Sequence, residues 1–538
     1  MAKTAATRHD LAEHLRTLEE MAAYGHTLLK IMGPLGSSAM PRQAITHPLA
    51  GPWSTPARSG GLIAWLAAGL ALLAATAALA AGAPGTGIKH VFLMVADGAG
   101  YNTWTAASMY QGRWDASTGK STQAYEGPDW VGFGCSTYPL NIASTPTGSG
   151  LQEVGLIYDP AKAWDREQAY GWLIATPTDS AAAATALSMG TKTYNRAINW
   201  SDQDQPLQPT LAEAAKAAGK AVGVVTTVPW SHATPAGLSN AHNVHRDHYV
   251  EIANEMLAIG VMDVIMGCGN PDYDNNGAPI ETAKEYKYVG GPETWSAIEA
   301  ARARPDGTYQ EFRPLSTQAE FTALTTGPTP PRVLGTAQVA TTLQQGRQAA
   351  DVGNPAADTP RNAQVPDLVT LVQGALNVLD EDPEGFFLAI EGGAIDWASH
   401  NQDANRLIQE QVDFIAAIEA VVHWIETHSH WGESLLIITS DHETGLLWGP
   451  GSDKLPFTPL VDQGPGRLPQ LAFNAKGHTN SLVRVHARGA GSAGLAQWVV
   501  GNDPVRGAYI DNTGVANVLR YAVAGPAPAL PASATPEP

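Results

Sequence analysis

The chain of 538 residues has only two cysteines, Cys135 and Cys268. In an oxidising compartment these two thiols could pair, and two unpaired buried thiols are an equal alternative. A single crosslink cannot stabilise a chain of this length, so a large apolar core must supply most of the stability. The 44% of residues that are hydrophobic suffice for such a core, in one large domain or in two.

Positive charge is also scarce in this sequence. Lys and Arg together number 32 against 51 Asp and Glu, which gives a formal net charge of −19 at pH 7. Nucleic acid is excluded as a specific partner, because a phosphate backbone requires a basic protein surface. A small phosphorylated substrate, held at a local cationic site, is compatible with this charge.

One long uncharged run is present, at residues 61–83. Arginines precede the run, and Ala-Leu-Ala at 78–80 resembles a cleavage site for signal peptidase. We predict that residues 1–83 form an N-terminal extension with a cleaved secretory signal. If it is not cleaved, the run is long enough to anchor the protein in a membrane. Both outcomes place the rest of the chain in the periplasm or outside the cell.

Short apolar runs alternate with helical segments along residues 84–523, which we predict to form the catalytic domain. Continuous apolar runs of this length are typical of strands buried on both faces. They occur at 90–98, 221–227, 263–267, 385–393, 434–442 and 482–487. Helices are expected at 180–190, 210–218, 248–259, 366–379, 402–428 and 493–500. The alternation predicts a three-layer α/β/α sandwich around a large, mostly parallel central sheet.

Two segments break this pattern. Residues 270–365 are rich in Pro, Gly, Thr and Ala, and we predict a long peripheral insertion rather than a second catalytic domain. Within it, NPDYDNNGA at 270–278 resembles the first half of a calcium loop, but Ala283 stands where such a loop has glutamate. An Asx-rich turn therefore fits better. The Pro/Ala-rich tail at 524–538 is expected to be disordered.

Carboxylates and histidines follow several of the apolar runs. In open α/β sheets, ligands bind at the carboxyl ends of the strands. The residues at such ends, or shortly beyond them, are Asp97, Glu391, Asp396, His400, Asp441, His442 and His478. Each alone could be a cap or a solvated side chain, but together they predict metal binding, because burying many acidic groups without cations is costly. Mixed nitrogen and carboxylate ligands suit zinc, and oxygen-rich sites suit magnesium.

Ser180 lies in TPTDSAAAATALSMGTKT (176–193), where the alanine run predicts a helix with Ser180 at or near its N-cap. A serine hydroxyl is a weak nucleophile and needs activation by a base or a metal. A helix N-terminus offers N–H groups and positive dipole to an anion. Serine, metals and a helix end together predict phosphoryl transfer to Ser180.

Taken in order, these motifs resemble the alkaline phosphatase family. TDSAAAATAL is similar to the family's nucleophile motif, and VADGAG, EGGAIDWASH, TSDHETG and GHT occur in the family's order. The resemblance extends from about residue 89 to 520. It implies an enzyme that hydrolyses small phosphate monoesters through a phosphoserine, uses two zinc ions and one magnesium ion, and is a homodimer.

The resemblance also implies a role for each site residue. One zinc would be held by Asp396, His400 and His478. The second zinc would be held by Asp97, Asp441 and His442, with Ser180 as its nucleophilic ligand. The magnesium would be held by Asp97, Glu391 and Thr234. Arg246, in NAHNVHRDHY (240–249), would clamp the phosphate, and Asp179 would orient that arginine.

These last assignments have ordinary alternatives. Thr234 could be a loop hydroxyl, and Arg246 stands among several cationic residues. The sequence also departs from the best-studied bacterial pattern, because His232 replaces an aspartate near the magnesium and Trp397 replaces a lysine near the phosphate. Losing the carboxylate should loosen the third metal site, and losing the lysine should speed the release of phosphate.

Two other functions fit parts of the same pattern. A phosphodiesterase or phosphonate monoesterase of the same superfamily would keep the metal set, but those enzymes often use threonine as the nucleophile. A non-catalytic phosphate- or metal-binding protein outside the cytoplasm would need no serine beside a metal.

Overall fold

The computed structural model describes residues 87–282, 284–348 and 360–525. The uncharged run at 61–83 and nearly all of the tail at 524–538 lie outside the described residues. Among those that are described, none of the helices combines the length and the apolar composition needed to cross a bilayer.

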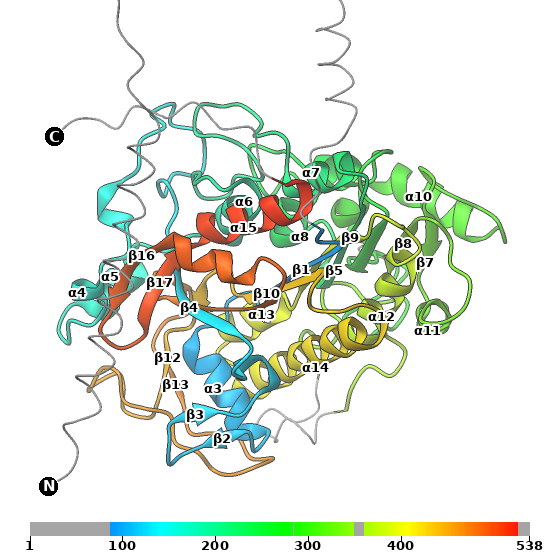
Figure 1. The fold of residues 1–538 in the computed structure, drawn as a ribbon. Helices are drawn as coiled ribbons and strands as arrows, with labels where there is room; N and C mark the ends of the chain where they lie inside the picture. The colour runs from blue at the N-terminus through cyan, green and yellow to red at the C-terminus, as the bar shows by residue number, and fades with distance from the viewer. Residues whose placement is uncertain (1–86, 283, 349–359, 526–538) are drawn as a thin grey trace, which may run out of the picture. The chain divides into compact units, whose positions relative to one another are not determined.

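A central sheet of eleven strands organises the described residues (Figure 1). Its strands are β1 (His90–Val95), β4 (Val131–Ser136), β5 (Ala221–Pro229), β6 (Val264–Cys268), β7 (Arg313–Leu315), β8 (Val333–Thr336), β9 (Phe386–Glu391), β10 (Ser434–Thr439), β15 (Val483–Gly489), β16 (Val499–Asp503) and β17 (Gly507–Asp511). The short strands outside it are β2 (Trp114–Asp115), β3 (Lys120–Ser121), β11 (Glu443–Thr444), β12 (Leu447–Trp448), β13 (Ala472–Phe473) and β14 (His478–Thr479).

The α-helices lie between these strands in the sequence. They are α3 (Tyr101–Tyr110), α4 (Pro160–Ala163), α5 (Ala169–Ala175), α6 (Ser180–Met189), α7 (Leu211–Ala217), α8 (Ala233–Gly237), α9 (Tyr249–Met256), α10 (Pro292–Arg302), α11 (Gln318–Leu324), α12 (Leu368–Leu379), α13 (Ala394–His400), α14 (Ala404–His428) and α15 (Asn512–Ala524).

The strand order confirms the predicted mostly parallel sheet. The order is β16-β17-β4-β15-β10-β1-β9-β5-β6-β8-β7, and every neighbouring pair from β10 to β7 is parallel. Within the central sheet, as far as it is described, antiparallel pairing is confined to β10–β15, β15–β4 and β16–β17. The carboxyl ends of these seven parallel strands therefore meet at one edge of the sheet.

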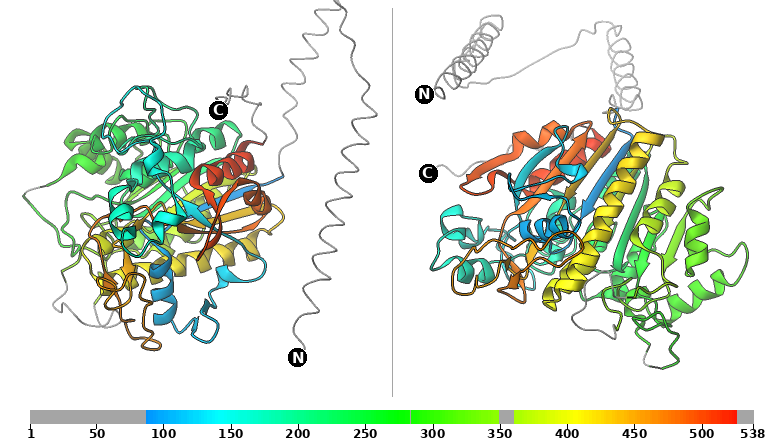
Figure 2. Two further views of the ribbon diagram at one scale, coloured as in Figure 1. Left: turned by 90° about the vertical axis from the view of Figure 1, so that its left-hand side faces the viewer. Right: turned by 90° about the horizontal axis from the view of Figure 1, so that it is seen from below.

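The two faces of the sheet pack against different helices, which completes the predicted three layers. In β1, Phe92 and Met94 join a core formed with α3, α12 and α14, whereas Leu93 and Val95 join a core formed with α6, α7 and α15. Figure 1 shows these helix groups on opposite faces of the sheet, and the right-hand view of Figure 2 shows the long α14 running along its face. Alternate burial on both faces explains why these strands read as continuous apolar runs.

All six predicted strands and five of the six predicted helical ranges are confirmed. The range 493–500 is helical only in part, because Ser492–Trp498 is a 3-10 helix rather than an α-helix and the chain then enters β16. Gly491 before this segment and Gly494 inside it lower its α-helix propensity.

The predicted insertion at 270–365 supplies two strands of the sheet. β8 pairs in parallel with β6, and β7 pairs in parallel with β8, so the segment extends one edge of the central sheet. Its acidic loop is an Asx turn, because Asp274 Oδ1 accepts the N–H groups of Asn276 and Ala278 at 2.8 Å each. Both cysteines are buried and free.

Candidate active site

Three of four neighbouring strands carry acidic residues to one edge of the sheet. β10, β1, β9 and β5 are adjacent and parallel, so the residues that follow them come together. Asp441 follows β10, Asp97 follows β1, and Glu391 ends β9. The sheet order thus explains how residues up to about 340 positions apart in the sequence form one site.

Asp97, Asp441 and His442 form what we call the buried cluster. Each offers a ligand atom, and these atoms lie within 4.8 Å of one another. His442 Nε2 lies 3.4 Å from Asp97 Oδ1 and 3.1 Å from Asp441 Oδ2. The other oxygen of Asp441 accepts the N–H of Gly98 at 3.1 Å, which fixes the carboxylate between β10 and β1.

Asp396, His400 and His478 form what we call the outer cluster, with ligand atoms again within 4.8 Å. The predicted i, i+4 pair lies on α13, and His478 comes from β14. The Nδ1 atoms of His400 and His478 contact the carbonyls of Lys476 at 2.5 Å and Thr178 at 2.9 Å. Because a carbonyl can only accept, both Nδ1 atoms carry the hydrogen, and the Nε2 atoms face the cluster.

The side chains of both clusters fit bound metal ions. Asp97 Oδ1 is buried and accepts no hydrogen bond from a described residue. Burial, and then the neighbouring carboxylates Asp441 and Asp396, raise the pKa of Asp97 well above its usual range. A cation at this point would relieve that repulsion. Imidazoles held through Nδ1 by backbone carbonyls, with carboxylates beside them, are the donor set that zinc prefers.

The histidines of the outer cluster differ in protonation. Burial lowers the pKa of His478 to about 4. For His400 burial also acts downwards, but the hydrogen bond with Asp396 outweighs it and raises the pKa to about 9. The Nε2 of His400, which holds the proton favoured by this raised pKa, lies 3.3 Å from Asp396 Oδ2 and 3.1 Å from His478 Nε2. A metal bound here would displace that proton.

A third group of oxygen atoms lies beside the buried cluster. Thr234 Oγ1 is 3.5 Å from Asp97 Oδ2, and Thr226 donates a short hydrogen bond to Glu391. Burial raises the pKa of Glu391 to about 7. His232, at the start of α8, packs near this group between Tyr249 and Trp397. Threonine and carboxylate oxygens would suit magnesium.

Ser180 is the first residue of α6, and its cap is Asp179. The Asp179 carboxylate accepts the N–H of Ala182 at 3.0 Å, so Asp179 is the cap and Ser180 lies next to it, in agreement with the prediction that Ser180 is at or near the N-cap. Both residue types are good caps, and the sequence does not separate them. Freed from capping, Ser180 Oγ lies 3.1 Å from His442 Nε2, at the buried cluster.

Arg246 reaches this site through Asp179. Its Nη1 lies 3.0 Å from Asp179 Oδ2, and the other carboxylate oxygen of Asp179 accepts the N–H of Arg196 at 2.8 Å. Burial and the Arg246 charge act in opposite directions on Asp179, and the arginine prevails, so the pKa of Asp179 falls. An open hollow of about 440 Å³, which we call the mouth, is lined by Asp179, Arg246, Tyr249 and His478.

The other cationic residues near Arg246 are engaged elsewhere. His242 Nδ1 lies 3.1 Å from Glu255, and His248 Nδ1 lies 2.8 Å from Asn243. His245 lies 3.8 Å from Asp247. Arg246 is therefore the cation of this segment that lines the mouth.

Thr444 is a site residue that the sequence reading missed. Its hydroxyl lies 2.6 Å from Asp396 Oδ1 and 3.2 Å from His442 Nδ1, so it joins the two clusters. A signal was available, because residues two apart on an extended chain point to the same face, and Thr444 follows His442 by two.

Comparison with known proteins gives one consistent result. The model of the family described as alkaline phosphatase matches residues 173–456. The chain is 32% identical over 275 residues to alkaline phosphatase 3 of Bacillus subtilis, covering 50% of this chain and 49% of that one. It is 28% identical over 353 residues to the alkaline phosphatase of Escherichia coli, covering 59% of this chain and 70% of that one.

The solved structures agree on the fold. A cold-active alkaline phosphatase from Shewanella sp. matches with a TM-score of 0.54 at 24% identity, over 81% of this chain and 99% of that one. This chain spans about half the length of the Bacillus subtilis relative.

Proposed function

Because the chain belongs to the alkaline phosphatase family, we propose that it hydrolyses phosphate monoesters through a covalent phosphoserine at Ser180. The observation that carries this proposal is the position of Ser180. Its Oγ lies 3.1 Å from His442 Nε2 in the buried cluster, at the first residue of a helix. Arg246 forms an ion pair with Asp179, the residue before Ser180, and lines the same mouth.

The protein groups would first bind and orient the phosphate. The guanidinium fork of Arg246 can donate to two phosphate oxygens at once. Asp179 holds that fork in place, and its cap leaves Ser180 at the positive end of α6. Phosphate would then lie between the serine hydroxyl and the arginine.

We assign the metal ions of the family to the buried cluster, to the outer cluster and to the group of oxygen atoms around Thr234 and Glu391. When bound, two zinc ions and one magnesium ion would supply Lewis acidity to the phosphate and to the reacting oxygens. The residues assigned to zinc are Asp396, His400 and His478 in the outer cluster, and Asp97, Asp441, His442 and Ser180 at the buried one. Those assigned to magnesium are Asp97, Glu391 and Thr234.

The reaction would proceed in two displacements at phosphorus. Ser180 Oγ loses its proton and forms a bond to phosphorus as the ester bond breaks, and the departing alcohol takes up a proton. Water then attacks the phosphoserine, which releases inorganic phosphate and restores the hydroxyl. Such transfers depend mainly on positioning and on stabilising the charge of the phosphoryl oxygens, which Arg246 and the end of α6 provide.

Two substitutions near the mouth distinguish this chain from the best-studied bacterial pattern. Trp397 packs against His232, with ring centroids 5.5 Å apart, and neither side chain adds a fixed charge. Burial lowers the pKa of His232 to about 3, so the ring is neutral. We expect phosphate to leave faster than from a site with a lysine at residue 397.

The test compares p-nitrophenyl phosphate with bis-p-nitrophenyl phosphate in protein reconstituted with zinc and magnesium. Faster turnover of the monoester is expected, and faster turnover of the diester would instead indicate a phosphodiesterase. Ser180→Ala should lower kcat by about 10³-fold or more while metal analysis shows the ions retained. Acid quenching with a labelled monoester should trap phosphoserine in the wild type only. Failure to trap it would support a non-catalytic binding protein.

We further propose that the protein acts outside the cytoplasm and forms a homodimer. Both proposals rest on the sequence and the family resemblance. Fractionation of cells and sedimentation equilibrium of the purified chain test them separately.

A further inference from the structure

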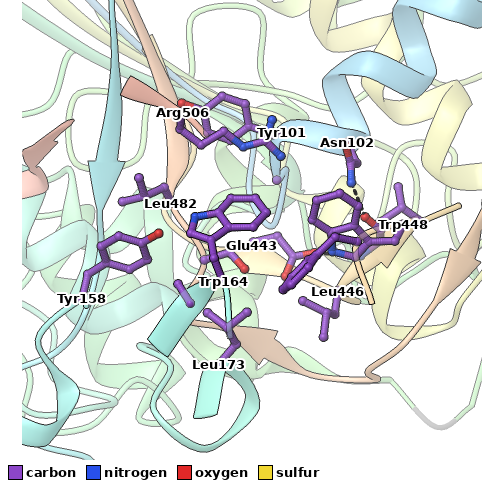
Figure 3. A pocket seen from close by; sticks show the side chains of 15 residues that line it. Tyr101, Asn102, Tyr158, Trp164, Leu173, Glu443, Leu446, Trp448, Leu482 and Arg506 are labelled. Carbon is purple, nitrogen blue, oxygen red and sulfur yellow. Dashed lines mark hydrogen bonds between the residues drawn. The ribbon is translucent and has the colours of Figure 1, made fainter. Parts of the chain in front are cut away.

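A second hollow lies behind the ribbon formed by β11 and β14, and its own side chains fill it (Figure 3). Trp164 lies 4.9 Å from Phe457 and 6.0 Å from Trp448, measured between ring centroids. The space left between these rings is about 40 Å³, against about 440 Å³ in the mouth. The mouth therefore has room for more of a substrate than its phosphate group, whereas the second hollow is packed core.

Arg196 is the second arginine that lines the mouth, together with Arg246. Its backbone is bound to the two residues that we assign to the phosphate. The N–H of Arg196 donates to Asp179 Oδ1 at 2.8 Å, and its carbonyl accepts the N–H of Arg246 at 2.8 Å. Asn195, the residue before it, accepts the N–H of Asp179 at 3.0 Å through Oδ1. The backbone of Arg196 is thus fixed relative to Ser180 and the clamping arginine.

The backbone of Arg196 has a conformation that glycine adopts more easily. Its φ is +76°, in the left-handed region, where a side chain adds strain. The hydrogen bonds with Asp179 and Arg246 retain this conformation. Residues other than glycine concentrate in this region at functional sites, where the surrounding structure holds them. The strain indicates that the side chain, and not the backbone, accounts for an arginine at this position.

The guanidinium of Arg196 has unused hydrogen-bond donors. Among the described residues its one hydrogen-bond partner is Asp247, whose Oδ2 lies 3.1 Å from Arg196 Nη1. This contact leaves Nη2 and Nε to a ligand. The two side chains are 45% and 54% exposed, so their ion pair is open to solvent and contributes little to stability. An anionic ligand could therefore bind to this arginine without uncovering a buried charge.

The charges around Arg196 favour a phosphate over a carboxylate as that ligand. Asp247 already provides a planar carboxylate with one negative charge, so a carboxylate from outside would gain little by replacing it. A phosphate group carries about two negative charges at neutral pH and three acceptor oxygens, which can use the donors beside Asp247. Asp179 does not compete for the guanidinium, because its oxygens already accept from Arg246, from Ala182 and from the backbone of Arg196.

We propose that Arg196 recognises a second phosphate group, so that the preferred substrates are small bisphosphates, with two phosphate monoesters on one carbon skeleton. This inference rests on the proposed function, in which Ser180 attacks the phosphate that Arg246 holds. Arg196 would bind the other phosphate through a fork of two N–H groups. The bond that breaks is still the ester bond at Ser180, and the second phosphate leaves with the alcohol. Because it lies away from the reacting phosphorus, it should act on KM more than on kcat.

Four-carbon monoesters that differ at their far end test the proposal. Butane-1,4-diol bisphosphate, 4-phosphonooxybutanoate and butyl phosphate carry a phosphate, a carboxylate and a methyl group there. In protein reconstituted with zinc and magnesium, kcat/KM for the bisphosphate should exceed that for butyl phosphate by about tenfold or more, beyond the factor of about two from its two equivalent ends. The carboxylate should stay close to butyl phosphate. Equal values for the bisphosphate and butyl phosphate, or a larger value for the carboxylate than for the bisphosphate, would overturn the proposal.

Arg196→Gly removes the guanidinium and keeps the backbone. Glycine adopts a φ of +76° without strain, so the contacts with Asp179 and Arg246 should remain and the Tm should stay close to that of the wild type. The ratio of kcat/KM between the bisphosphate and butyl phosphate should drop at least about tenfold. Arg166→Gln, at an exposed arginine outside the mouth, is the matched control and should retain the ratio. A wild-type ratio in Arg196→Gly, or its loss in Arg166→Gln, would contradict the proposal.

Binding without turnover separates this inference from the proposed function. In isothermal titration, butane-1,4-diphosphonate, which cannot be hydrolysed, should bind at least about tenfold more tightly than butylphosphonate to the wild type, but not to Arg196→Gly. If butyl phosphate is hydrolysed and the two phosphonates bind equally, the role of Arg196 is wrong and the phosphatase proposal stands. If the diphosphonate binds more tightly through Arg196 and no monoester is hydrolysed, the proposed function fails, and with it the assignment of bisphosphates as substrates.

Discussion

The buried and outer clusters use the same kinds of side chain in opposite surroundings. Asp97, Asp441 and His442 are 1%, 0% and 0% exposed, whereas 39% of the His400 side chain is exposed. The buried cluster follows strands in the centre of the sheet, and the outer cluster comes from a short helix and a two-residue strand. The difference suggests a division of labour, in which one cluster fixes the nucleophile and the other exchanges with solvent and the leaving alcohol.

The largest effect is expected at the buried cluster. Asp441→Asn removes a charge that holds the cluster together beside Ser180, and kcat/KM should fall by about 10³-fold or more. Turnover of p-nitrophenyl phosphate with zinc titration measures this, and added zinc should not restore activity. Asp263→Asn, at a buried aspartate paired with Lys216 away from the site, is the control. If Asp441→Asn lowered kcat/KM by less than about tenfold, the buried cluster would not be the more important of the two for activity.

A smaller loss is expected at the outer cluster. His400→Asn should lower kcat/KM by about 10²-fold, and excess zinc should restore part of it, because an exposed cluster can rebind metal from solution. The same zinc titration checks this. His423→Asn, at an exposed histidine of α14, should be neutral. If zinc rescued Asp441→Asn better than His400→Asn, the comparison between the clusters would be reversed.

Chelation should separate the two clusters in time. With EDTA in excess, zinc release from the wild type should show two phases, with the slow phase at least about tenfold slower because its ligands are buried. A chromogenic zinc indicator in stopped flow follows both phases. In His400→Asn the fast phase should disappear. A single phase in the wild type would indicate that burial does not control exchange.

Thr444 should couple the clusters with a moderate effect. Thr444→Val removes the hydroxyl that contacts both Asp396 and His442, and zinc affinity should fall about 10- to 100-fold, as for other partners of metal ligands. Competition with a chelator of known affinity measures this. Thr444→Ser retains the hydroxyl and should behave like the wild type. Unchanged zinc affinity in Thr444→Val would show that the contacts of the Thr444 hydroxyl do not contribute to metal binding.

The smallest effect is expected at the mouth. Trp397→Lys adds a cation near the phosphate, so inhibition by inorganic phosphate should strengthen by a few fold, about 1 kcal/mol at most for a partly exposed charge. Inhibition constants with p-nitrophenyl phosphate test this, and Trp397→Phe serves as the uncharged control. Unchanged or weaker phosphate inhibition in the lysine variant would contradict the proposed role of Trp397.

The sequence predicted the central strands well, because burial on both faces produces continuous apolar runs. It also predicted which residues follow those strands, and the parallel order then brought Asp97, Glu391 and Asp441 together. β4, with the sequence VGFGCS, was missed because two glycines interrupt its apolar pattern. α3 was missed because its polar and aromatic residues give little helical periodicity.

Contacts that depend on tertiary packing could not be predicted from the sequence. The position of Thr444 between two clusters requires the pairing of β11 with β14. Strands of two residues are too short to show a pattern in the sequence that would predict this pairing. The contacts of the His400 and His478 Nδ1 atoms with the carbonyls of Lys476 and Thr178 likewise depend on how the backbone folds. Neither arrangement has a periodicity or a motif.

Asp179 performs two tasks with one carboxylate, since one oxygen caps α6 and the other holds Arg246. The stability of the helix that presents Ser180 and the aim of the arginine are therefore not independent traits. Asparagine at this position could still cap the helix but would carry no charge for the guanidinium. A substitution at Asp179 that changes substrate binding would also change the end of the helix that presents Ser180. Few residues at this position can therefore alter one property and preserve the other.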